Sequence, residues 1–377
     1  MALATPATGI IKERLFFLDW LRIAAVVVLV LYHVGMYYVN WDFHVKSPFA
    51  SASLQPWMRL TSPWRMDLLF MISGTATALL LKAGATADIL KKRSRFLLLP
   101  LLCGVVLIVP PQSYFEVVQK YAFNGGFSDF LGFYLSGHKG FCNNGRCLIL
   151  PTWNHLWFLP YVWCYTLFLW TVVKIKPDAL KLAASYLDRW LNPAVMLLVP
   201  IALICVVRML LSARFPSTHA LFDDWFNHSI YLGMFLTGAV LATHDLVWSA
   251  AARWRWATLL LALVSWLCLI AIQPGKPWTY LLLGVQQWCA VLAALGFAKQ
   301  HLNVDHPARQ HLSQAVFPIY IFHQTVIIVG SQLLLPLRWS PAVEGPVLVF
   351  IALVVSYAGF VLIRQVTWLR PWFGIKS

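Results

Sequence analysis

Long hydrophobic stretches, separated by short polar intervals, run along this chain of 377 residues. Each stretch is close to the roughly 20 residues that an α-helix needs to cross a bilayer. They lie at residues 16–39, 64–81, 96–113, 153–173, 193–212, 227–243, 256–273, 278–298, 314–335 and 343–363. The pattern therefore predicts an all-α fold, a polytopic integral membrane helix bundle with about ten transmembrane helices.

The first hydrophobic stretch is unusual because it carries Asp19, Arg22 and His33. On an α-helix, the step from Arg22 to His33 turns through roughly 1100°, about 20° past three full turns, and rises roughly 16.5 Å. The two residues therefore share one face at different depths. Asp19 lies one turn before Arg22, where it can pair with the guanidinium. Because polar groups in lipid are costly, this face is predicted to line a polar cavity.

The composition excludes a soluble protein, because 60% of the residues are hydrophobic and only 11% are charged. The formal charge of +15 is explained first by orientation in the membrane, and no nucleic-acid partner is expected. With the N-terminus in the cytoplasm, 18 of the 29 lysines and arginines fall in inner segments and 9 in outer loops. The positive-inside rule then predicts cytoplasmic termini in the inner (plasma) membrane. Residues 16–39 are too long for a cleaved signal, so the first helix is expected to be an uncleaved anchor.

No appended soluble domain is evident, so residues 1–377 are expected to form a single membrane-embedded domain. The longest polar interval, residues 114–152, is predicted to be an extracytoplasmic loop, too short and too aromatic for a separate enzyme domain. It contains Cys142 and Cys147 on either side of an Asn-Gly pair, where an oxidising compartment would permit a disulfide. The spacing of the cysteines and histidines suggests no metal site.

The second hydrophobic stretch carries further candidate residues. Arg65 and Asp67 lie at its expected outer mouth, where they line a site or simply pair with each other at the interface. Ser73 and Gly74 lie nearer its middle. A patch of small residues for close helix packing is favoured there over a covalent nucleophile, because no partner base adjoins Ser73.

The fourth and ninth stretches add histidines. Asn154 and His155 lie just inside the outer interface, next to an aromatic belt that includes Trp157. His155 is either solvated there or part of a site. His323 and Gln324 lie about ten residues inside the ninth stretch, where they are costly unless both face a cavity.

The polar residues thus have two ends. His33, His155 and His323 are all expected on the outer half of the membrane, and histidine is suited to take a proton from an attacking hydroxyl. Arg22 and the basic run at residues 91–95 are expected on the inner side, where they suit a phosphate-bearing donor. For Lys92, Arg93 and Arg95 individually, enforcing topology is the simpler interpretation.

Taken in order, several motifs resemble the acyltransferase 3 family of integral membrane O-acyltransferases. Its hallmark is a basic residue separated from a histidine by ten residues on the first helix, which Arg22 and His33 match. The further similarities are MDLLFMISG at 66–74, the basic run before LLLP at 97–100, HLWFL at 155–159 and FPIYIFHQ at 317–324. Within the family, the sequence is most similar to the glucan biosynthesis protein C subgroup, which succinylates periplasmic glucans.

This resemblance implies that an acyl group, such as succinyl or acetyl, moves from cytoplasmic acyl-CoA to a hydroxyl of an extracytoplasmic carbohydrate. It makes His33 the essential histidine of the family and Arg22 its basic partner. Our hypothesis is that His33 acts as the general base, with Arg22 and Asp19 fixing the donor side, and no metal is expected. The candidate acceptor residues are Arg65, Asp67, Ser73, Asn154, His155, Trp157, His323 and Gln324. Arg65 is also a candidate to bind the carboxylate of a succinyl donor.

The candidate donor residues are Lys92, Arg93 and Arg95. They depart from the usual family motif of two arginines three positions apart, because the two arginines are two apart and Lys92 supplies the spacing of three.

A transporter or flippase is the alternative function. Buried aspartate, arginine and histidine residues also line solute and proton pathways in polytopic proteins. Against it, the chain lacks paired spans interrupted by glycine or proline in two matching halves. Neither the acyl group, the acceptor nor the oligomeric state follows from the sequence.

Overall fold

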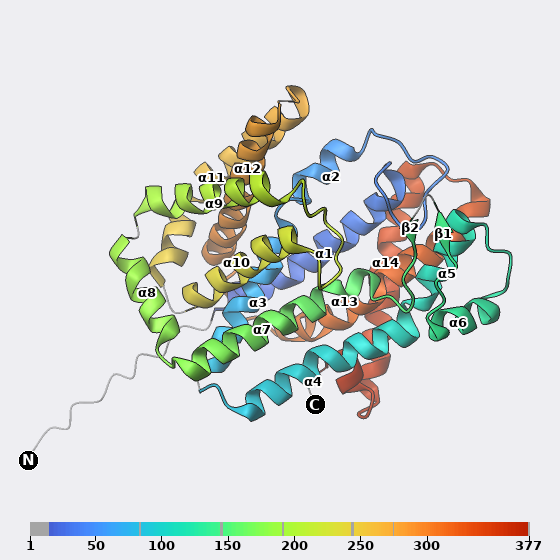
Figure 1. The fold of residues 1–377 in the computed structure, drawn as a ribbon, viewed down its shortest axis with the longest axis horizontal. Helices are drawn as coiled ribbons and strands as arrows, with labels where there is room; N and C mark the ends of the chain where they lie inside the picture. Colours follow the sequence, from blue (N-terminus) through green and yellow to red (C-terminus); the bar gives the residue numbers. More distant parts are fainter. Residues whose placement is uncertain are drawn as a thin grey trace, which may run out of the picture.

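The chain folds as a bundle of long α-helices (Figure 1). This computed structural model describes residues 15–82, 84–143, 146–190, 192–242, 245–273 and 275–375. The helices are α1 (Phe16–Tyr38), α2 (Gln55–Thr61), α3 (Arg65–Leu81), α4 (Ala87–Cys103), α5 (Pro110–Tyr121), α6 (Phe127–Ser136), α7 (Phe158–Ile175), α8 (Ala179–Trp190), α9 (Pro193–Leu211), α10 (Trp225–Leu241), α11 (Asp245–Ala271), α12 (Lys276–His301), α13 (Pro307–Leu334) and α14 (Pro341–Gln365).

Four short turns and one hairpin complete the described elements. The turns are the π-helical η1 (Gly104–Ile108) and the 3-10 helices η2 (Asn154–Trp157), η3 (Leu335–Leu337) and η4 (Arg370–Phe373). The hairpin pairs β1 (Cys142–Asn143) with β2 (Arg146–Cys147) in antiparallel register.

Several helices begin where the sequence supplies a cap or a proline. The Thr86 hydroxyl accepts a hydrogen bond from the Ile89 amide at the start of α4. The Asn192 side chain accepts one from the Val195 amide at the start of α9, where Pro193 is the first helical residue. The first amide groups of a helix have no acceptor within it. A capping side chain accepts a hydrogen bond from one of them, and proline has no amide hydrogen to satisfy.

The number of membrane spans differs from the predicted ten. Among the described residues, eight segments are long and apolar enough to cross a membrane, or nine if α4 and α5, bent by 45°, form one span. The predicted span at 227–243 corresponds to α10, whose 17 residues reach only about 25 Å, less than the roughly 30 Å of a bilayer core. The chain is nevertheless an all-α polytopic helix bundle, as predicted.

Helix α10 packs closely against α3 through glycines. A Cβ atom on Gly74 would lie 1.8 Å from the carbonyl oxygen of Phe235, and one on Gly238 would lie 2.0 Å from that of Met71. The Thr75 hydroxyl donates a hydrogen bond of 2.9 Å to the Gly238 carbonyl. The backbones of the two helices are therefore in contact, which confirms the interpretation of this patch as a packing surface.

Helix α1 runs through the middle of the bundle in Figure 1. It contacts α3, α12, α13 and α14. Its buried residues include Leu21, Ala25 and Leu29, whereas Leu31 on another face is half exposed. The helix that carries the candidate catalytic residues is therefore held on several sides.

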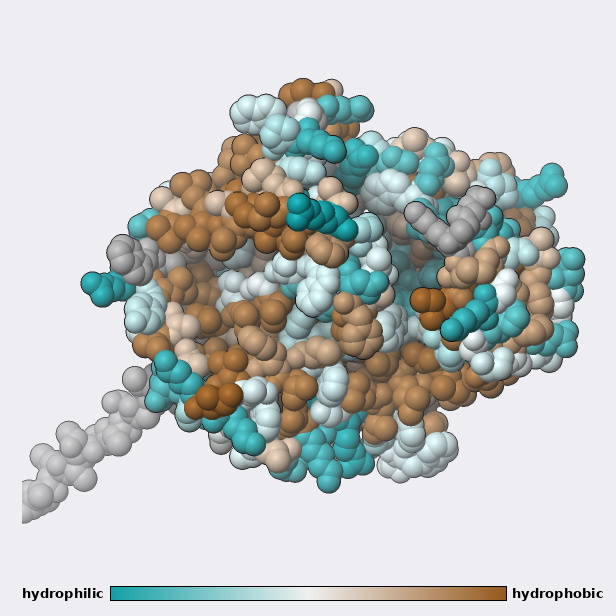
Figure 2. All heavy atoms as spheres, in the orientation of Figure 1, coloured by the Kyte–Doolittle hydropathy of each residue, from teal (hydrophilic) through white to brown (hydrophobic). Residues whose placement is uncertain are grey.

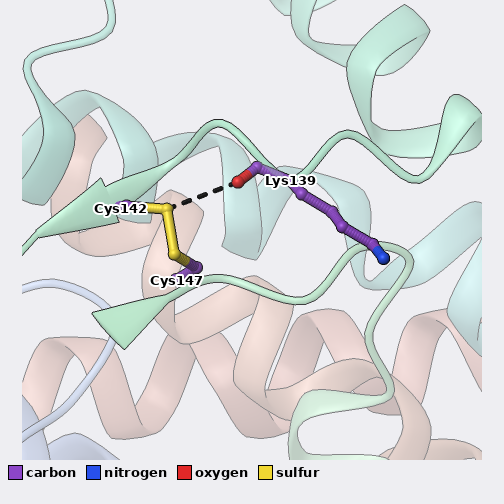
Figure 3. Close-up of a disulfide and its surroundings, with 3 residues drawn as sticks. All are labelled: Lys139, Cys142 and Cys147. Atoms are coloured by element: carbon purple, nitrogen blue, oxygen red, sulfur yellow. Dashed lines mark hydrogen bonds between the residues drawn. A yellow bond between two sulfur atoms is a disulfide. The ribbon is translucent and has the colours of Figure 1, made fainter. Parts of the chain in front are cut away.

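The interval at 114–152 is largely ordered secondary structure rather than an irregular loop. It contains the end of α5, helix α6 and the β1–β2 hairpin. A disulfide joins Cys142 to Cys147 across the hairpin, as the sequence permitted, and Figure 3 shows the Lys139 carbonyl beside it. Asn144 and Gly145, the predicted turn, lie outside the described residues. Figure 2 shows hydrophilic side chains in a hollow between α9 and this hairpin.

Candidate active site

Two of the candidate histidines meet at the centre of the site. His33 on α1 and His323 on α13 approach to 2.7 Å between Nδ1 of His33 and Nε2 of His323. Nδ1 of His323 lies 2.8 Å from the Tyr320 carbonyl, which can only accept a hydrogen bond. Nδ1 of His323 therefore carries the proton, and in the neutral pair its Nε2 accepts a hydrogen bond from Nδ1–H of His33.

This arrangement leaves Nε2 of His33 unprotonated. No hydrogen bond to this nitrogen occurs from any residue that the structure describes, and His33 is partly exposed whereas His323 is fully buried. The ring of Phe43 stacks near His33, with ring centroids 6.3 Å apart. A lone pair on a ring whose orientation is fixed from the other side is the arrangement that a general base needs.

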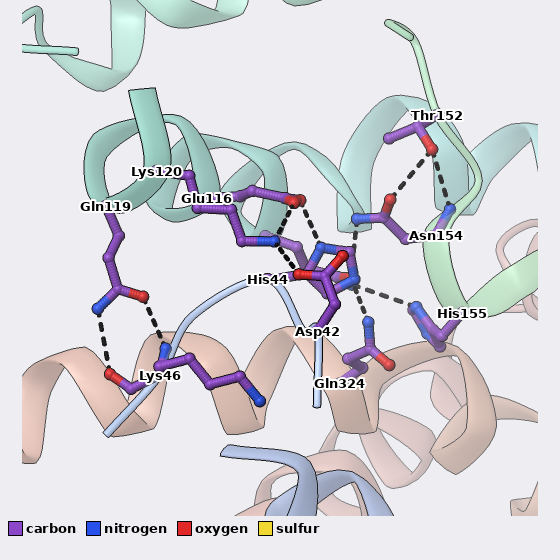
Figure 4. Close-up of polar contacts among 11 residues, drawn as sticks. Asp42, His44, Lys46, Glu116, Gln119, Lys120, Thr152, Asn154, His155 and Gln324 are labelled. Atoms are coloured by element: carbon purple, nitrogen blue, oxygen red, sulfur yellow. Dashed lines mark hydrogen bonds and ion pairs between the residues drawn. The ribbon is translucent and has the colours of Figure 1, made fainter. Parts of the chain in front are cut away.

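A buried glutamine connects several of the other candidates. The Gln112 carbonyl oxygen accepts hydrogen bonds from Asn154 at 3.2 Å and Gln324 at 3.0 Å. Its amide nitrogen donates to Thr325 at 2.6 Å and approaches Nδ1 of His155 at 3.3 Å. Figure 4 shows Asn154, His155 and Gln324 converging around this point. All four hydrogen-bonding positions of the amide are used, so its orientation is fixed.

His155 is part of this support. Its Nε2 lies 3.0 Å from the Ile321 carbonyl and donates to it, which leaves Nδ1 as the acceptor for Gln112. The ring of His155 stands edge-on to His323, with centroids 5.2 Å apart. His155 is buried, so the solvated alternative does not apply. Both ring nitrogens are bonded to the protein, and His155 therefore positions its neighbours in this structure.

The N-terminal end of α1, predicted from the sequence to be the inner end, carries a second cluster, called the inner cluster below. The predicted pair of Asp19 and Arg22 is present, with 3.4 Å between Asp19 Oδ1 and Arg22 Nη2. The other Asp19 oxygen accepts a hydrogen bond from Arg309, which is buried on α13. Arg22 also donates to the Ser313 carbonyl at 3.5 Å. Asp19 thus joins two guanidinium groups.

Arg93 belongs to this inner cluster. It lies close enough to Arg22 for the two positive charges to repel each other. Nε of Arg22 and Nε of Arg93 are both buried and have no hydrogen-bond partner within the described part of the chain. Unpaired buried donors are costly, so arginines with such donors are suited to an anion.

Arg65 and Asp67 do not form an ion pair with each other among the described residues. The Arg65 guanidinium stacks on Tyr32, with its central carbon 3.2 Å from the ring centroid. Asp67, buried on α3, accepts a hydrogen bond from Gln287, which in turn accepts one from Arg208. The pairing alternative is therefore wrong, because each residue has its own partner.

A loop between α9 and α10 adds an aromatic surface. The ring of His219 lies against Trp157, with ring centroids 4.2 Å apart. Tyr231 also stacks on Trp157, with ring centroids 5.6 Å apart. The His219 amide donates to Asp224 at 3.2 Å, which holds this residue at a positive φ of 55°. Burial lowers the pKa of His219; Asp224 opposes this shift and Arg65 adds to it.

Comparison with known families decides the class of protein. The model of the family described as "Acyltransferase domain" matches residues 15–364. The chain belongs to the acyltransferase 3 family. No curated protein and no solved structure matches the chain significantly. This acyltransferase is therefore a multi-pass membrane enzyme that transfers acyl groups other than amino-acyl groups, and the match favours the enzyme over the transporter alternative.

Of the basic residues on α4, the acyltransferase brings only Arg93 towards Arg22. Lys92 pairs with Asp88 at 2.7 Å and its side chain is 76% exposed. Arg95 is exposed as well. The altered spacing of the motif thus leaves a single arginine of this run in the inner cluster.

The segment that follows α1 is fastened to α5. His44 pairs with Glu116 at 2.5 Å, and Lys120 bridges Glu116 at 3.0 Å and Asp42 at 2.8 Å. Figure 4 shows these four side chains together. Because Phe43, next to His44, lies over His33, this network fixes the outer covering of the candidate base.

Lys46 also holds the segment that follows α1 against the end of that helix. Its ammonium donates to the carbonyls of Met36 and Val39, each at 2.7 Å. Gln119 exchanges two hydrogen bonds with the Lys46 backbone (Figure 4). Burial lowers the pKa of Lys46 to about 8, an effect that Asp42 opposes and Lys120 increases.

The sequence did not identify three residues of the candidate site, which are Gln112, Arg309 and His219. A signal existed for Gln112, which follows the two prolines that begin α5 and is a polar residue in a hydrophobic stretch. Arg309 was counted only as an inner positive charge. Ser73 is partly exposed on α3, and no hydrogen bond joins it to a histidine among the described residues.

Proposed function

We propose that this acyltransferase moves an acyl group from cytoplasmic acyl-CoA to a hydroxyl of an extracytoplasmic carbohydrate, with His33 as the general base. The observation that carries the proposal is the His33–His323 pair, in which the Tyr320 carbonyl sets both tautomers and leaves Nε2 of His33 free to take a proton. The arrangement matches the Arg22–His33 spacing that is the hallmark of the family.

In the proposed reaction, Nε2 of His33 removes the proton of the acceptor hydroxyl as its oxygen attacks the thioester carbonyl. The new C–O bond forms, the C–S bond breaks, and the proton passes from His33 to the departing sulfur of CoA. During the transfer, His33 is positively charged and its Nδ1–H remains hydrogen-bonded to His323. Hydrogen bonds to a charged group are about twice as strong as neutral ones, so His323 would stabilise this state.

The inner cluster is the proposed donor site. Arg22 and Arg93 would bind phosphate groups of the donor, while Asp19 and Arg309 hold Arg22 in place. Lys92 and Arg95, exposed on the same helix, would attract the donor from the cytoplasm. The thioester arm would then span the roughly 16.5 Å of helix between Arg22 and His33.

The proposed acceptor site comprises the residues around Gln112 and the aromatic surface of Trp157 and His219. Trp157 and His219 offer an aromatic surface on which a sugar ring could stack. Asn154, His155 and Gln324 would contribute by holding Gln112 in place. Asp67 would hold α3, the helix that also carries Arg65. A succinyl donor is favoured by the resemblance to the periplasmic glucan subgroup, and Arg65 would bind its carboxylate.

The test uses purified protein in liposomes with acyl-CoA labelled in the acyl group. The proposal predicts that free CoA is released and that the label appears on a periplasmic glucan, only when the glucan is present. Solute uptake with an intact donor would contradict it. Label trapped on the protein at His33 or Ser73 before the acceptor is added would replace direct transfer with a two-step route.

A further inference from the structure

A basic cavity that opens to the surface lies between α11 and α12. Its volume is about 330 Å³. The described residues that line it are Ser249, Ala252, Arg253, Arg255, Lys299 and Gln300. They include three cations and no carboxylate. A cavity lined in this way is suited to an anion rather than to a neutral solute.

The cavity is next to the inner end of the catalytic helix. The Lys299 ammonium lies 5.8 Å from the ring centroid of Phe17 on α1. The Phe17 amide donates to Asn303 at 3.4 Å, just after α12, and its ring packs on Trp248 of α11. Phe17 is two residues before Asp19. The cavity is thus at the same end of the bundle as the inner arginine cluster.

One cation of the cavity is buried on one side. Nε of Arg255 is buried without a hydrogen-bond partner within the part of the chain that the structure describes. Nη1 of the same side chain donates to the Ala252 carbonyl at 2.5 Å. The guanidinium is therefore held in place, with part of its donor capacity unused by the described residues.

Arg253 heads an apolar stripe on the surface of α11. Counting in steps of three and four residues, its face continues through Trp256, Leu260, Leu263 and Leu267. These side chains are exposed, from 36% for Leu263 to 64% for Trp256. A basic residue followed by tryptophan and then by leucines is the order of groups met on passing from the headgroup region into the hydrocarbon of a bilayer.

We propose that this cavity binds the phosphate headgroup of an anionic membrane lipid. The cations would contact the phosphate, Trp256 would lie at the level of the glycerol backbone, and an acyl chain would follow Leu260, Leu263 and Leu267. Basic pockets between transmembrane helices are known to take such headgroups. A soluble phosphate compound would use the same cations but gain nothing from the apolar stripe.

A bound lipid would brace α11 and α12 against the start of α1. Because Phe17 packs on Trp248 of α11 and lies beside Lys299 of α12, the lipid would limit movement of the first turn of α1, which carries Asp19. This site does not depend on the identity of the acyl donor or acceptor, so it can be tested separately from the proposed function.

Native mass spectrometry of the purified protein with phosphatidylglycerol or phosphatidylcholine tests the site. Wild-type protein is expected to retain phosphatidylglycerol in preference to phosphatidylcholine. Arg253→Gln should weaken this retention about fivefold, since a basic residue near an anionic surface contributes about 1 kcal/mol. Gln300→Glu, which adds a negative charge to the lining, should weaken it in the same direction.

Lys181→Gln is the matched control, because Lys181 is 85% exposed on α8 and pairs with Asp178. It should leave lipid retention unchanged, and all variants are compared by size-exclusion profile. Unchanged retention in both Arg253→Gln and Gln300→Glu would overturn the proposal. A loss of inorganic phosphate or CoA binding in these variants, with lipid retention intact, would assign the cavity to a soluble anion and would overturn it equally.

Discussion

The two ends of α1, the helix that carries Arg22 and His33, accommodate buried polar groups in opposite ways. At the outer end, His323, His155 and Gln112 use every donor and acceptor that they have on protein partners. At the inner end, Arg22 and Arg93 have Nε atoms with no hydrogen-bond partner among the described residues. The outer end is preorganised around one free nitrogen, whereas the inner end has unused binding capacity for an anion.

The largest effect is expected from the free nitrogen itself. His33→Ala should lower kcat by about 10²- to 10⁴-fold, the usual contribution of a general base. The measurement is transfer of labelled acyl groups to glucan under saturating donor. His311→Ala is the control, since His311 is only partly buried on α13 and pairs with Tyr357 and Arg364. Equal losses in the two variants would assign the effect to stability of the bundle.

The next largest effect is expected for His323, the hydrogen-bond acceptor that orients His33. His323→Leu should lower kcat by about 10- to 100-fold, because it removes a hydrogen bond to a group that becomes charged. His323→Gln should recover part of this loss, since its side-chain oxygen can accept from Nδ1–H of His33. The KM for acyl-CoA should stay the same in both. Equal activity of the leucine and glutamine variants would rule out the positioning role.

At the inner end, Arg93→Ala should raise the KM for acyl-CoA about tenfold, the expected loss for one hydrogen bond to a phosphate. Lys92→Ala lies one residue away and should change it little, because Lys92 is exposed and already paired with Asp88. Isothermal titration calorimetry with CoA compares the affinities of the two variants for the donor without turnover. A larger effect for Lys92 would mean that the donor binds at the surface of α4.

The smallest effect is expected on selectivity. Arg65→Ala should reduce succinyl transfer relative to acetyl transfer by a few-fold, because acetyl groups lack the carboxylate that Arg65 would bind. The two donors are compared in one competition assay, so any loss of folded protein cancels. An unchanged ratio would remove Arg65 from succinyl recognition.

Much of this site could be predicted from the helix containing residues 16–39. The pairing of Asp19 with Arg22 follows from their spacing of one turn. The cost of burying His155 and His323 likewise identified them as candidates. The sequence predicted only that the three histidines lie in the outer half of the membrane; their mutual contact is seen in the structure.

The rest depends on packing between helices. Arg309 reaches Asp19, and Gln112 reaches four side chains, only because α13 and α5 lie where they do. No periodicity in the sequence specifies such partners. The same is true of His33, whose free nitrogen follows from a carbonyl on α13 that sequence patterns do not describe.

The contact between α3 and α10 has a consequence for engineering this enzyme. Because Gly74 and Gly238 leave no room for a side chain, the two helices must move as one unit. A side chain at either position would meet the backbone of the other helix, so neither glycine can be replaced without moving both helices. Redesign of the enzyme should therefore leave the two glycines untouched.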